Sequence, residues 1–221
     1  MPRPSRNLDR ALLAAGRELF ATSGCAGLSV REVAEAAGVN LGMFHYHFKS
    51  REAFLRALLQ NVYEEMFARL TYEAAAEWGP VENLRAVLRF IGRFIRDNRP
   101  VLARVLADAV CGEPVALDFI RENFPRHLGL VQSLLDAAKE AGVVKPVATQ
   151  QLLGFCAGSV GMSILFAGAA AQSGAMSRAG ARALERAMLS DAAIDERVEL
   201  ALAAITLPAA APKRRPAKRP T

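Results

Sequence analysis

The chain has 221 residues and is 52% apolar, which suffices for a sizeable core in one large domain or in a small domain and a larger one. Its formal charge of +6 is uneven: residues 1–60 carry 8 basic and 5 acidic side chains, residues 61–207 carry 15 and 17, and residues 208–221 carry 5 and 0. Positive charge at both ends favours a polyanion-binding head joined to a body of another function, and it argues against a uniformly acidic or basic protein.

Nearly every segment is predicted to be helical. The first helix starts near residue 5, and Gly24 is a natural end for it. Ser29 and Glu32 form a capping box that opens a short second helix, which we expect to end at Gly38. The head therefore begins with one longer helix followed by a helix of about two turns.

A third helix is predicted from the N-cap candidate Asn40 to Phe48, and a fourth, long helix starts at Ser50. Further helices are predicted over residues 81–98, 101–112, 115–142, 149–174 and 191–207. Pro125 should kink or split the helix that contains it. Residues 175–190 are expected to be a looser link rich in Ala, Gly and Ser, and residues 208–221 a disordered basic tail.

Two short helices joined by a glycine-containing turn and packed on a preceding helix form a helix-turn-helix, whose second helix enters the major groove of DNA. The sequence AGVNLGMFHYHFKS, residues 37–50, suits this second helix. Asn40 can cap the helix and also reach DNA, and Gly42 permits a close approach. His45, Tyr46 and Lys49 offer hydrogen-bond donors to phosphate oxygens, which position a protein without reading the base sequence.

The stretch LLAAGRELFATSGCAGLSVREVAEAAGVNLGMFHYHFKSREAFLRAL resembles the N-terminal DNA-binding domain of the TetR family of bacterial transcriptional regulators. The resemblance covers roughly residues 8–60, and the rest of the chain is similar only in its succession of helices. It implies that these residues lie at or near DNA: Arg31, Asn40, Leu41, Gly42, Met43, His45, Tyr46 and Lys49.

The chain departs from the usual family pattern at several of these positions. Members commonly have Ser in place of Asn40, a polar or basic residue in place of Leu41, Thr in place of Met43, and frequently Tyr in place of His45. Leu41 and Met43 cannot donate to phosphate, but they could contact thymine methyl groups. Leu41 also has the spacing of a core residue, so base contact and core packing are both open for it.

Metal binding and catalysis are not expected. His45 and His47 are two apart on a helix and point in nearly opposite directions, so they cannot chelate one ion, and His127 stands alone. The three cysteines, Cys25, Cys111 and Cys156, are widely spaced and are expected to be reduced and mostly buried, a redox-sensing pair being the alternative. We find no nucleophile–base pair and no phosphate-cradling loop, so the protein is not predicted to be an enzyme or to carry a cofactor.

The two termini offer a further route to DNA. Arg3 and Arg6 lie in an N-terminal arm, residues 1–7, that could enter the minor groove or remain solvated. The basic tail residues could add salt-sensitive affinity for DNA, although a solvated tail is the favoured interpretation. These tail residues are Lys213, Arg214, Arg215, Lys218 and Arg219.

The body is expected to bind a small, largely apolar effector through few polar anchors. The candidate pocket residues are Phe90, Phe94, Arg104, Phe124, His127, Phe155 and Met162, with Asp108 as a further anchor, although most of the apolar ones also suit an ordinary core. A stripe of four arginines, namely Arg85, Arg89, Arg93 and Arg96, follows one helix. We expect a solvated helix face there, and a site for an anionic effector such as an acyl-CoA is the alternative.

The apolar stretch around residues 152–171 has no flanking positive cluster, so we expect a buried helix, not a membrane span. Its small residues, among them Gly154, Gly158 and Gly161, would let helices approach closely. We expect the helices around 149–172 and 191–207 to form a two-fold homodimer interface. The alternative is that the glycines serve packing within one chain.

The prediction is therefore an all-α protein with a three-helix helix-turn-helix domain over residues 1–50 and a larger helical effector-binding and dimerisation domain over residues 51–207. The expected function is that of a cytoplasmic homodimeric transcriptional regulator. It would bind a palindromic DNA operator, most often as a repressor, and a small molecule would release it. A DNA-binding regulator or activator without a small effector remains the alternative.

Overall fold

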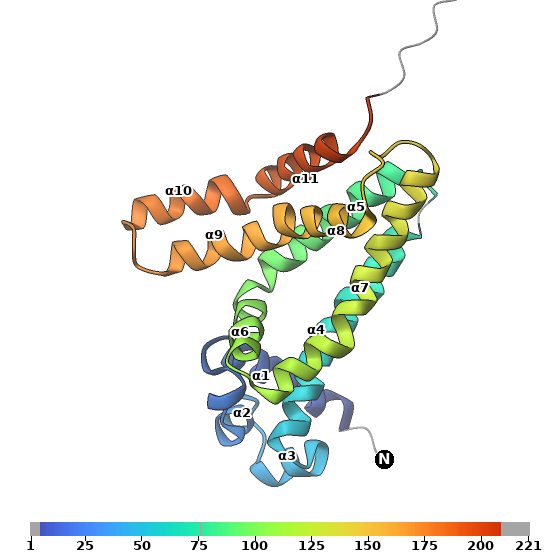
Figure 1. Ribbon diagram of the computed structural model, residues 1–221. Helices are drawn as coiled ribbons and strands as arrows, with labels where there is room; N and C mark the ends of the chain where they lie inside the picture. Colours follow the sequence, from blue (N-terminus) through green and yellow to red (C-terminus); the bar gives the residue numbers. More distant parts are fainter. Residues whose placement is uncertain (1–4, 76, 209–221) are drawn as a thin grey trace, which may run out of the picture.

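The computed structural model describes residues 5–75 and 77–208, and every element that it assigns within these ranges is helical (Figure 1). The elements are α1 Ser5–Gly27, α2 Val30–Ala36, α3 Leu41–Phe48, α4 Arg51–Ala74, α5 Pro80–Asp97, α6 Arg99–Val110, α7 Pro114–Glu140, α8 Thr149–Cys156, the π-helical turn η1 Ala157–Met162, α9 Ser163–Gln172, α10 Arg178–Leu189 and α11 Asp191–Ile205. The predicted fold class is confirmed: a small N-terminal helix-turn-helix unit precedes a larger helical body.

The helix starts in the head follow from polar side chains that accept backbone N–H groups otherwise left without partners. The Ser29 hydroxyl accepts from the N–H of Glu32 at 3.4 Å, and the Asn40 side chain accepts from the N–H of Met43 at 2.9 Å. Ser50 caps α4 in the same way, at 3.1 Å. All three predicted N-caps are therefore confirmed.

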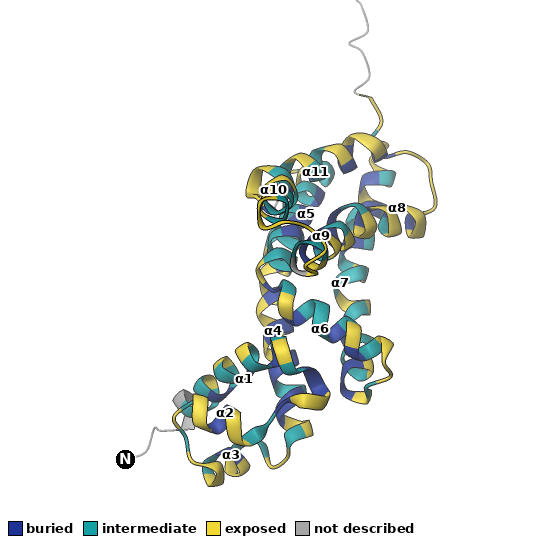
Figure 2. Cartoon of the chain, turned by 90° about the vertical axis from the view of Figure 1, so that its left-hand side faces the viewer, coloured by how far each residue is buried: buried dark blue, intermediate teal, exposed yellow. Residues whose placement is uncertain are grey.

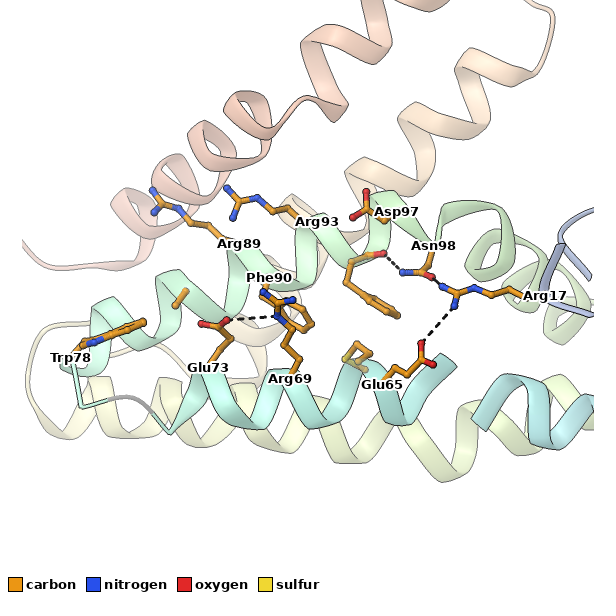
Figure 3. Close-up of a pocket in the computed structure, with 13 residues that line it drawn as sticks. Arg17, Glu65, Arg69, Glu73, Trp78, Arg89, Phe90, Arg93, Asp97 and Asn98 are labelled. Atoms are coloured by element: carbon orange, nitrogen blue, oxygen red, sulfur yellow. Dashed lines mark hydrogen bonds and ion pairs between the residues drawn. The ribbon is translucent and has the colours of Figure 1, made fainter. Parts of the chain in front are cut away.

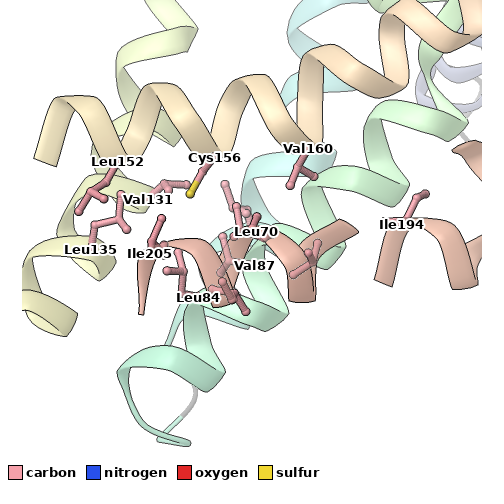
Figure 4. Close-up of a cluster of buried hydrophobic side chains, with 14 of the residues drawn as sticks. Leu70, Leu84, Val87, Val131, Leu135, Leu152, Cys156, Val160, Ile194 and Ile205 are labelled. Carbon is pink, nitrogen blue, oxygen red and sulfur yellow. The ribbon is translucent and has the colours of Figure 1, made fainter. Parts of the chain in front are cut away.

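Two hydrophobic clusters hold the molecule together, and α4 contributes to both. Its first half packs Phe54, Leu55, Leu58 and Leu59 into the head cluster, and its second half packs Tyr63, Met66 and Leu70 into the body cluster. The body cluster also gathers side chains from α5, α7, α8, η1 and α11 (Figure 4). Figure 2 marks the buried, intermediate and exposed positions along the chain. The long helix thus belongs to the cores of both the head and the body.

The head cluster also takes in side chains from beyond the expected domain boundary. Val101 and Val105 of α6 and Val115 of α7 are buried in it beside Phe20. A boundary at residue 50 therefore divides the helix-turn-helix from the rest of the sequence, but it cuts through a shared core. We keep residues 1–50 and 51–207 as a proposal, and the tail 208–221 lies, apart from its first residue, outside the described residues.

One expectation about the body was wrong, and for a second the structure excludes one of two alternatives. The segment expected to be a loose link contains the twelve-residue helix α10, which Ser177 caps by accepting from the N–H of Gly180 at 3.1 Å. Pro125 does not split α7, which is assigned as one helix of 27 residues. Two residues before this proline the Asn123 carbonyl accepts a hydrogen bond from the Tyr63 hydroxyl at 2.7 Å, which ties α7 to α4.

The apolar stretch Thr149–Ala171 is, among the described residues, the one segment long and apolar enough to cross a membrane, with a mean hydropathy of 1.8. Only 39% of its most apolar window is buried within the chain, so the expectation of a buried helix is met on one side alone. Gly161 lies on the inner side, where a Cβ would stand 3.2 Å from Ile95. Gly154 and Gly158 face open space, so the structure leaves a second face of this helix uncovered.

Candidate functional site

The inner face of α3 anchors it to the head. Phe44 is fully buried, and its ring lies 5.0 Å from that of Phe54 and 5.6 Å from that of Phe48. Phe48 and Phe54 meet edge to face at 4.9 Å. This aromatic cluster, formed by Phe44, Phe48 and Phe54, fixes which side of the short helix points outward.

The outer face of α3 lies at the end of the molecule remote from α10 and α11 (Figure 1). Tyr46 is 75% exposed, and His45 and Lys49 are also exposed. Leu41 is 38% exposed and is absent from the buried head cluster, which favours its surface interpretation over core packing. The structure thus brings a ring, an imidazole, an ammonium group and an aliphatic side chain to one outward surface.

The remaining predicted DNA residues flank this surface. Arg31 is exposed on α2, and Met43 is half-buried. The side-chain oxygen of Asn40 accepts the capping hydrogen bond from Met43, which leaves the side-chain NH2 group as the part of Asn40 that can donate to DNA. Gly42 is exposed, and a Cβ there would lie 3.3 Å from that Asn40 oxygen, so the glycine leaves room for the cap.

Three head residues that the sequence analysis did not single out as supports hold α3 and α4 in place. The His47 Nδ1 lies 2.5 Å from an Asp9 carboxylate oxygen, which ties α3 to α1. Arg51 donates from Nε to the Leu28 carbonyl at 2.8 Å and from a second nitrogen to the Cys25 carbonyl. A His beside an aromatic run gives no sign in the sequence of which residue it will meet, because its partner lies on another helix.

Arg104 and Asp108 lie at the junction of head and body, which corrects their assignment as effector anchors. They pair with each other at 3.0 Å on α6. The buried Asp108 also accepts the backbone N–H of Cys25 at 2.7 Å, and Arg104 donates to the Ser23 carbonyl at 3.3 Å. Both side chains therefore satisfy backbone groups freed where Gly24, with φ of 66°, interrupts α1.

The seven predicted pocket residues do not converge on one site. Phe90 and Phe94 line a groove of about 620 Å³ between α4 and α5 (Figure 3). His127 and Phe124 lie on α7, where the His127 Nδ1 is 3.5 Å from the Tyr63 hydroxyl, and burial lowers the pKa of His127. Those contacts favour a structural histidine.

Phe155 and Met162 are exposed on α8 and η1, on the uncovered face of the apolar helix. They point away from the body cluster because its buried positions on this helix are Leu152, Cys156 and Val160. The structure therefore does not place them in an effector cavity.

The four arginines of α5 are neither a bare solvated face nor a free anion site. They form ion pairs with three carboxylates of α11. The N–O distances for Arg85, Arg89 and Arg93 are 2.8–3.6 Å. Arg96 pairs with Asp191 and donates to the Leu189 carbonyl. The acidic partners, namely Asp191, Asp195 and Glu199, follow α11 at the same spacing of four. The pairing was missed because it joins segments about 100 residues apart.

No group of three or more His, Cys, Asp or Glu side chains within residues 5–75 and 77–208 is arranged to hold a metal ion. Cys25 and Cys156 are buried and Cys111 is exposed, and all three are free thiols. Burial, followed by the nearby Asp108 carboxylate, raises the pKa of Cys25 to about 12, and burial raises that of Cys156 to about 11. These two thiols stay protonated near neutral pH.

Comparison with known proteins bears on both the head and the whole fold. The family model "Bacterial regulatory proteins, tetR family" matches residues 12–58. The chain is 28% identical over 136 residues, 61% of its length, to the HTH-type transcriptional regulator EthR of Mycolicibacterium smegmatis. It is 30% identical over 139 residues, 63% of its length, to an HTH-type transcriptional repressor of Mycobacterium tuberculosis. The matches span 62% and 63% of the length of these relatives.

Among solved structures, the ketosteroid transcriptional regulator KstR2 of Mycobacterium tuberculosis has a TM-score of 0.64 at 19% identity. That likeness covers 94% of this chain and 98% of the other, and it shows a shared fold. The relatives are named as regulators of transcription, in agreement with the expectation that the chain is not an enzyme.

Proposed function

Because the chain belongs to the TetR family of bacterial regulatory proteins, we propose that it is a homodimeric, cytoplasmic transcriptional regulator that binds a palindromic operator and is released from it by a small molecule. Repression is the proposed sign of regulation. One of the matched relatives is named as a repressor.

The observation that carries the proposal is the two-sided construction of α3. Its aromatic cluster fixes the helix on the head, and its outward side presents Leu41, His45, Tyr46 and Lys49. Exposed aromatic and basic side chains on a short, capped helix suit the major groove better than solvent, because burying a ring such as Tyr46 against DNA removes apolar surface from water. We propose that Tyr46 and Lys49 contact phosphates, and that Leu41 contacts thymine methyl groups.

The uncovered face of the apolar helix supports the proposed dimer. Phe155, Met162 and Phe166 are exposed on it, and Leu200 is exposed on α11. The open surface above Gly154 and Gly158 would admit a second helix at close range. A four-helix interface built from two copies of α8–α9 and α11 would cover these side chains and present two α3 helices to one DNA duplex.

Selection of bound DNA from a random pool by the purified full-length protein, at physiological salt, tests the proposal. We expect one palindromic sequence to be enriched. Tyr46→Ala and Lys49→Ala should each weaken binding to it at least about tenfold, since each removes from every protomer a contact to a charged phosphate worth about 1.5 kcal/mol or more. Arg121→Ala, which changes an exposed arginine on α7, is the matched control and should bind like the parent protein.

Removal of the basic tail separates site-specific recognition from non-specific attraction to DNA. A variant that ends at residue 208 should keep its preference for the palindrome and lose only part of its affinity for random DNA. Enrichment of no sequence, or binding that disappears with the tail alone, would overturn the proposed function.

A further inference from the structure

Two surface grooves adjoin where the head meets the body, and both are lined by Arg17 of α1. The first, of about 620 Å³, runs between α4 and α5 (Figure 3). The second, of about 700 Å³, runs between α1 and the corner that joins α5 to α6. They share Arg17, Glu65, Asp97 and Asn98, so a single elongated molecule could occupy both. Their volumes lie in the range of small-molecule sites.

The guanidinium groups of the first groove differ in how firmly they are paired. Arg89 and Arg93 are held by α11 carboxylates at 2.8–2.9 Å. Arg69 has only a 4.0 Å contact with Glu73, and Arg17 has a 3.6 Å contact with Glu65. A guanidinium carries five N–H donors, so Arg17 and Arg69 retain donors for a ligand, and a carboxylate can accept two of them at once.

The wall between these arginines is apolar. Phe90 and Phe94 of α5 and Met66 of α4 line it. Figure 3 shows Trp78 at the far end of the groove from Arg17. The Arg69 guanidinium lies 5.7 Å from the centre of the Phe90 ring and so borders both the apolar and the charged part. A molecule with an acidic end and a hydrocarbon or aromatic body matches this order of side chains.

We propose that the joined grooves bind an amphipathic carboxylate, whose acidic end is held by Arg17 and whose apolar body lies along Phe90 and Phe94 toward Arg69 and Trp78. The inference rests on the proposed regulatory function and names its effector class. The site differs from the largely apolar pocket with few polar anchors that the sequence predicted, because seven of the thirteen residues that line the first groove are charged.

Arg17 gives the site a route to the DNA-binding head. Its guanidinium donates to the side-chain oxygen of Asn98, which is buried at the α5–α6 corner, while the Asn98 amide donates to the Phe94 carbonyl at 2.9 Å. A carboxylate that binds the remaining donors and draws the guanidinium further into the groove breaks its bond to the Asn98 oxygen and loosens α1 from the body. Ligand binding and DNA binding then oppose each other, and by linkage each weakens the other equally.

Trp78, the single tryptophan of the chain, provides the readout. Its fluorescence is followed while the full-length protein is titrated with decanoate, decan-1-ol or decyltrimethylammonium below their micelle concentrations. We expect a saturable change with decanoate and at least about tenfold weaker responses to the alcohol and the cation, because only the carboxylate gains charge-assisted bonds. Equal responses to all three, or no saturable response to decanoate, would overturn the proposal.

Substitutions on α4 sharpen the test, because one of them should improve binding. Glu65→Gln removes the carboxylate that competes for Arg17, so decanoate should bind about two- to fivefold tighter. Arg17→Gln should weaken it about tenfold, and Arg69→Gln, which lies beside the apolar body of the ligand, should weaken it much less. Glu64→Gln is the matched control, since Glu64 pairs with Arg126 on the other side of α4. Tighter binding cannot come from misfolding, and an unchanged affinity in Glu65→Gln would contradict the assigned role of Arg17.

The DNA readout separates this inference from the proposed function. With the selected palindrome, saturating decanoate should lower the DNA affinity of the parent protein at least about threefold and that of Arg17→Gln much less. Decanoate binding without any effect on DNA affinity would overturn the coupling through Arg17. A protein that selects no DNA would overturn the proposed function, while the fluorescence titration would still decide whether the grooves hold a carboxylate.

Discussion

Residue environments in this protein differ sharply even among side chains of one type, as the three cysteines show. Cys25 sits behind the interruption of α1, with its N–H bound to Asp108, and Cys156 belongs to the body cluster. Cys111 follows the end of α6 and is exposed. The expectation of mostly buried thiols therefore holds for two of them, and the third is open to solvent.

We predict that one thiol per native chain reacts quickly with a disulfide reagent such as Ellman's reagent at pH 8. Cys25 and Cys156 have pKa values raised to about 12 and about 11, so they hold almost no thiolate at that pH, and their burial also bars the reagent. Cys111→Ser should remove the fast phase, and denaturant should release the other two thiols. Two fast equivalents in the native parent protein would contradict this assignment.

Local residue roles could be predicted where both partners lie within one turn of helix. Ser29, Asn40 and Ser50 precede the N–H groups that they cap, so the pattern alone indicates the contact. Arg51 and Asp108 could not be assigned in this way. Their partners are backbone groups near Gly24, and only the tertiary structure brings those groups within reach.

At the scale of elements, the contact between α5 and α11 combines an apolar side with a ladder of ion pairs. Ile194 and Val198 of α11 are buried in the body cluster. Beside them Asp195 lies 2.8 Å from Arg93 and 3.4 Å from Arg89, and Glu199 pairs with Arg85 and Arg89 at 2.9 Å. Shared partners make this a network, which stabilises more than isolated exposed pairs do.

We predict that Asp195→Asn lowers the free energy of unfolding by about 1 kcal/mol at low salt, because two half-exposed guanidinium groups lose a carboxylate. The loss should shrink at 1 M salt, where screening weakens the network already present in the parent protein. Urea denaturation at both salt concentrations measures it. Glu196→Gln, one residue along on the exposed side of α11, serves as control. An equal loss at both salt concentrations would indicate that packing, not charge, is responsible.

Element positions were predictable where apolar periodicity and caps agreed, as in α2, α3 and α4. Helix α10 was missed because its glycine and its many alanines resemble a linker, although Ala, Arg, Leu and Glu favour helix strongly. Its stability comes from packing against α9 and α11 (Figure 1), which no local pattern reports. In α7 the helix likewise continues through Pro125, and contacts with α4 such as the Tyr63–Asn123 hydrogen bond hold it in place.

At the scale of the whole molecule, the head could be located from sequence but the effector site could not. The residues of the helix-turn-helix follow one another in the sequence, and their composition is typical of DNA binding. The grooves around Arg17 combine residues of α1, α4 and α5, and their pairing depends on α11, so the site exists only after the chain has folded. The uncovered face of the apolar helix was predictable only in part. Its small residues indicated close helix packing, but only the structure shows which of them face outward.

We predict that this outward face determines the oligomeric state. Phe166 is 77% exposed on this face, and a stable interface would bury it in a desolvated patch with Phe155 and Met162. The parent protein should sediment at twice its chain mass of 23.8 kDa, and Phe166→Glu should sediment as a monomer, because burying a carboxylate at an apolar interface costs several kcal/mol. Val110→Glu, which introduces the same charge at an exposed valine outside this face, is the control and should remain dimeric.

The same pair of variants links assembly to DNA binding. Each α3 contacts one half-site, and tethering two of them raises the effective concentration of the second, so the Phe166→Glu monomer should bind the selected palindrome at least about a hundredfold more weakly. Its helix content by circular dichroism should match that of the parent, since Phe166 contributes nothing to the buried core of one chain. A Phe166→Glu protein that stays dimeric would place the interface elsewhere, and a monomer with undiminished DNA affinity would contradict recognition by a two-fold dimer.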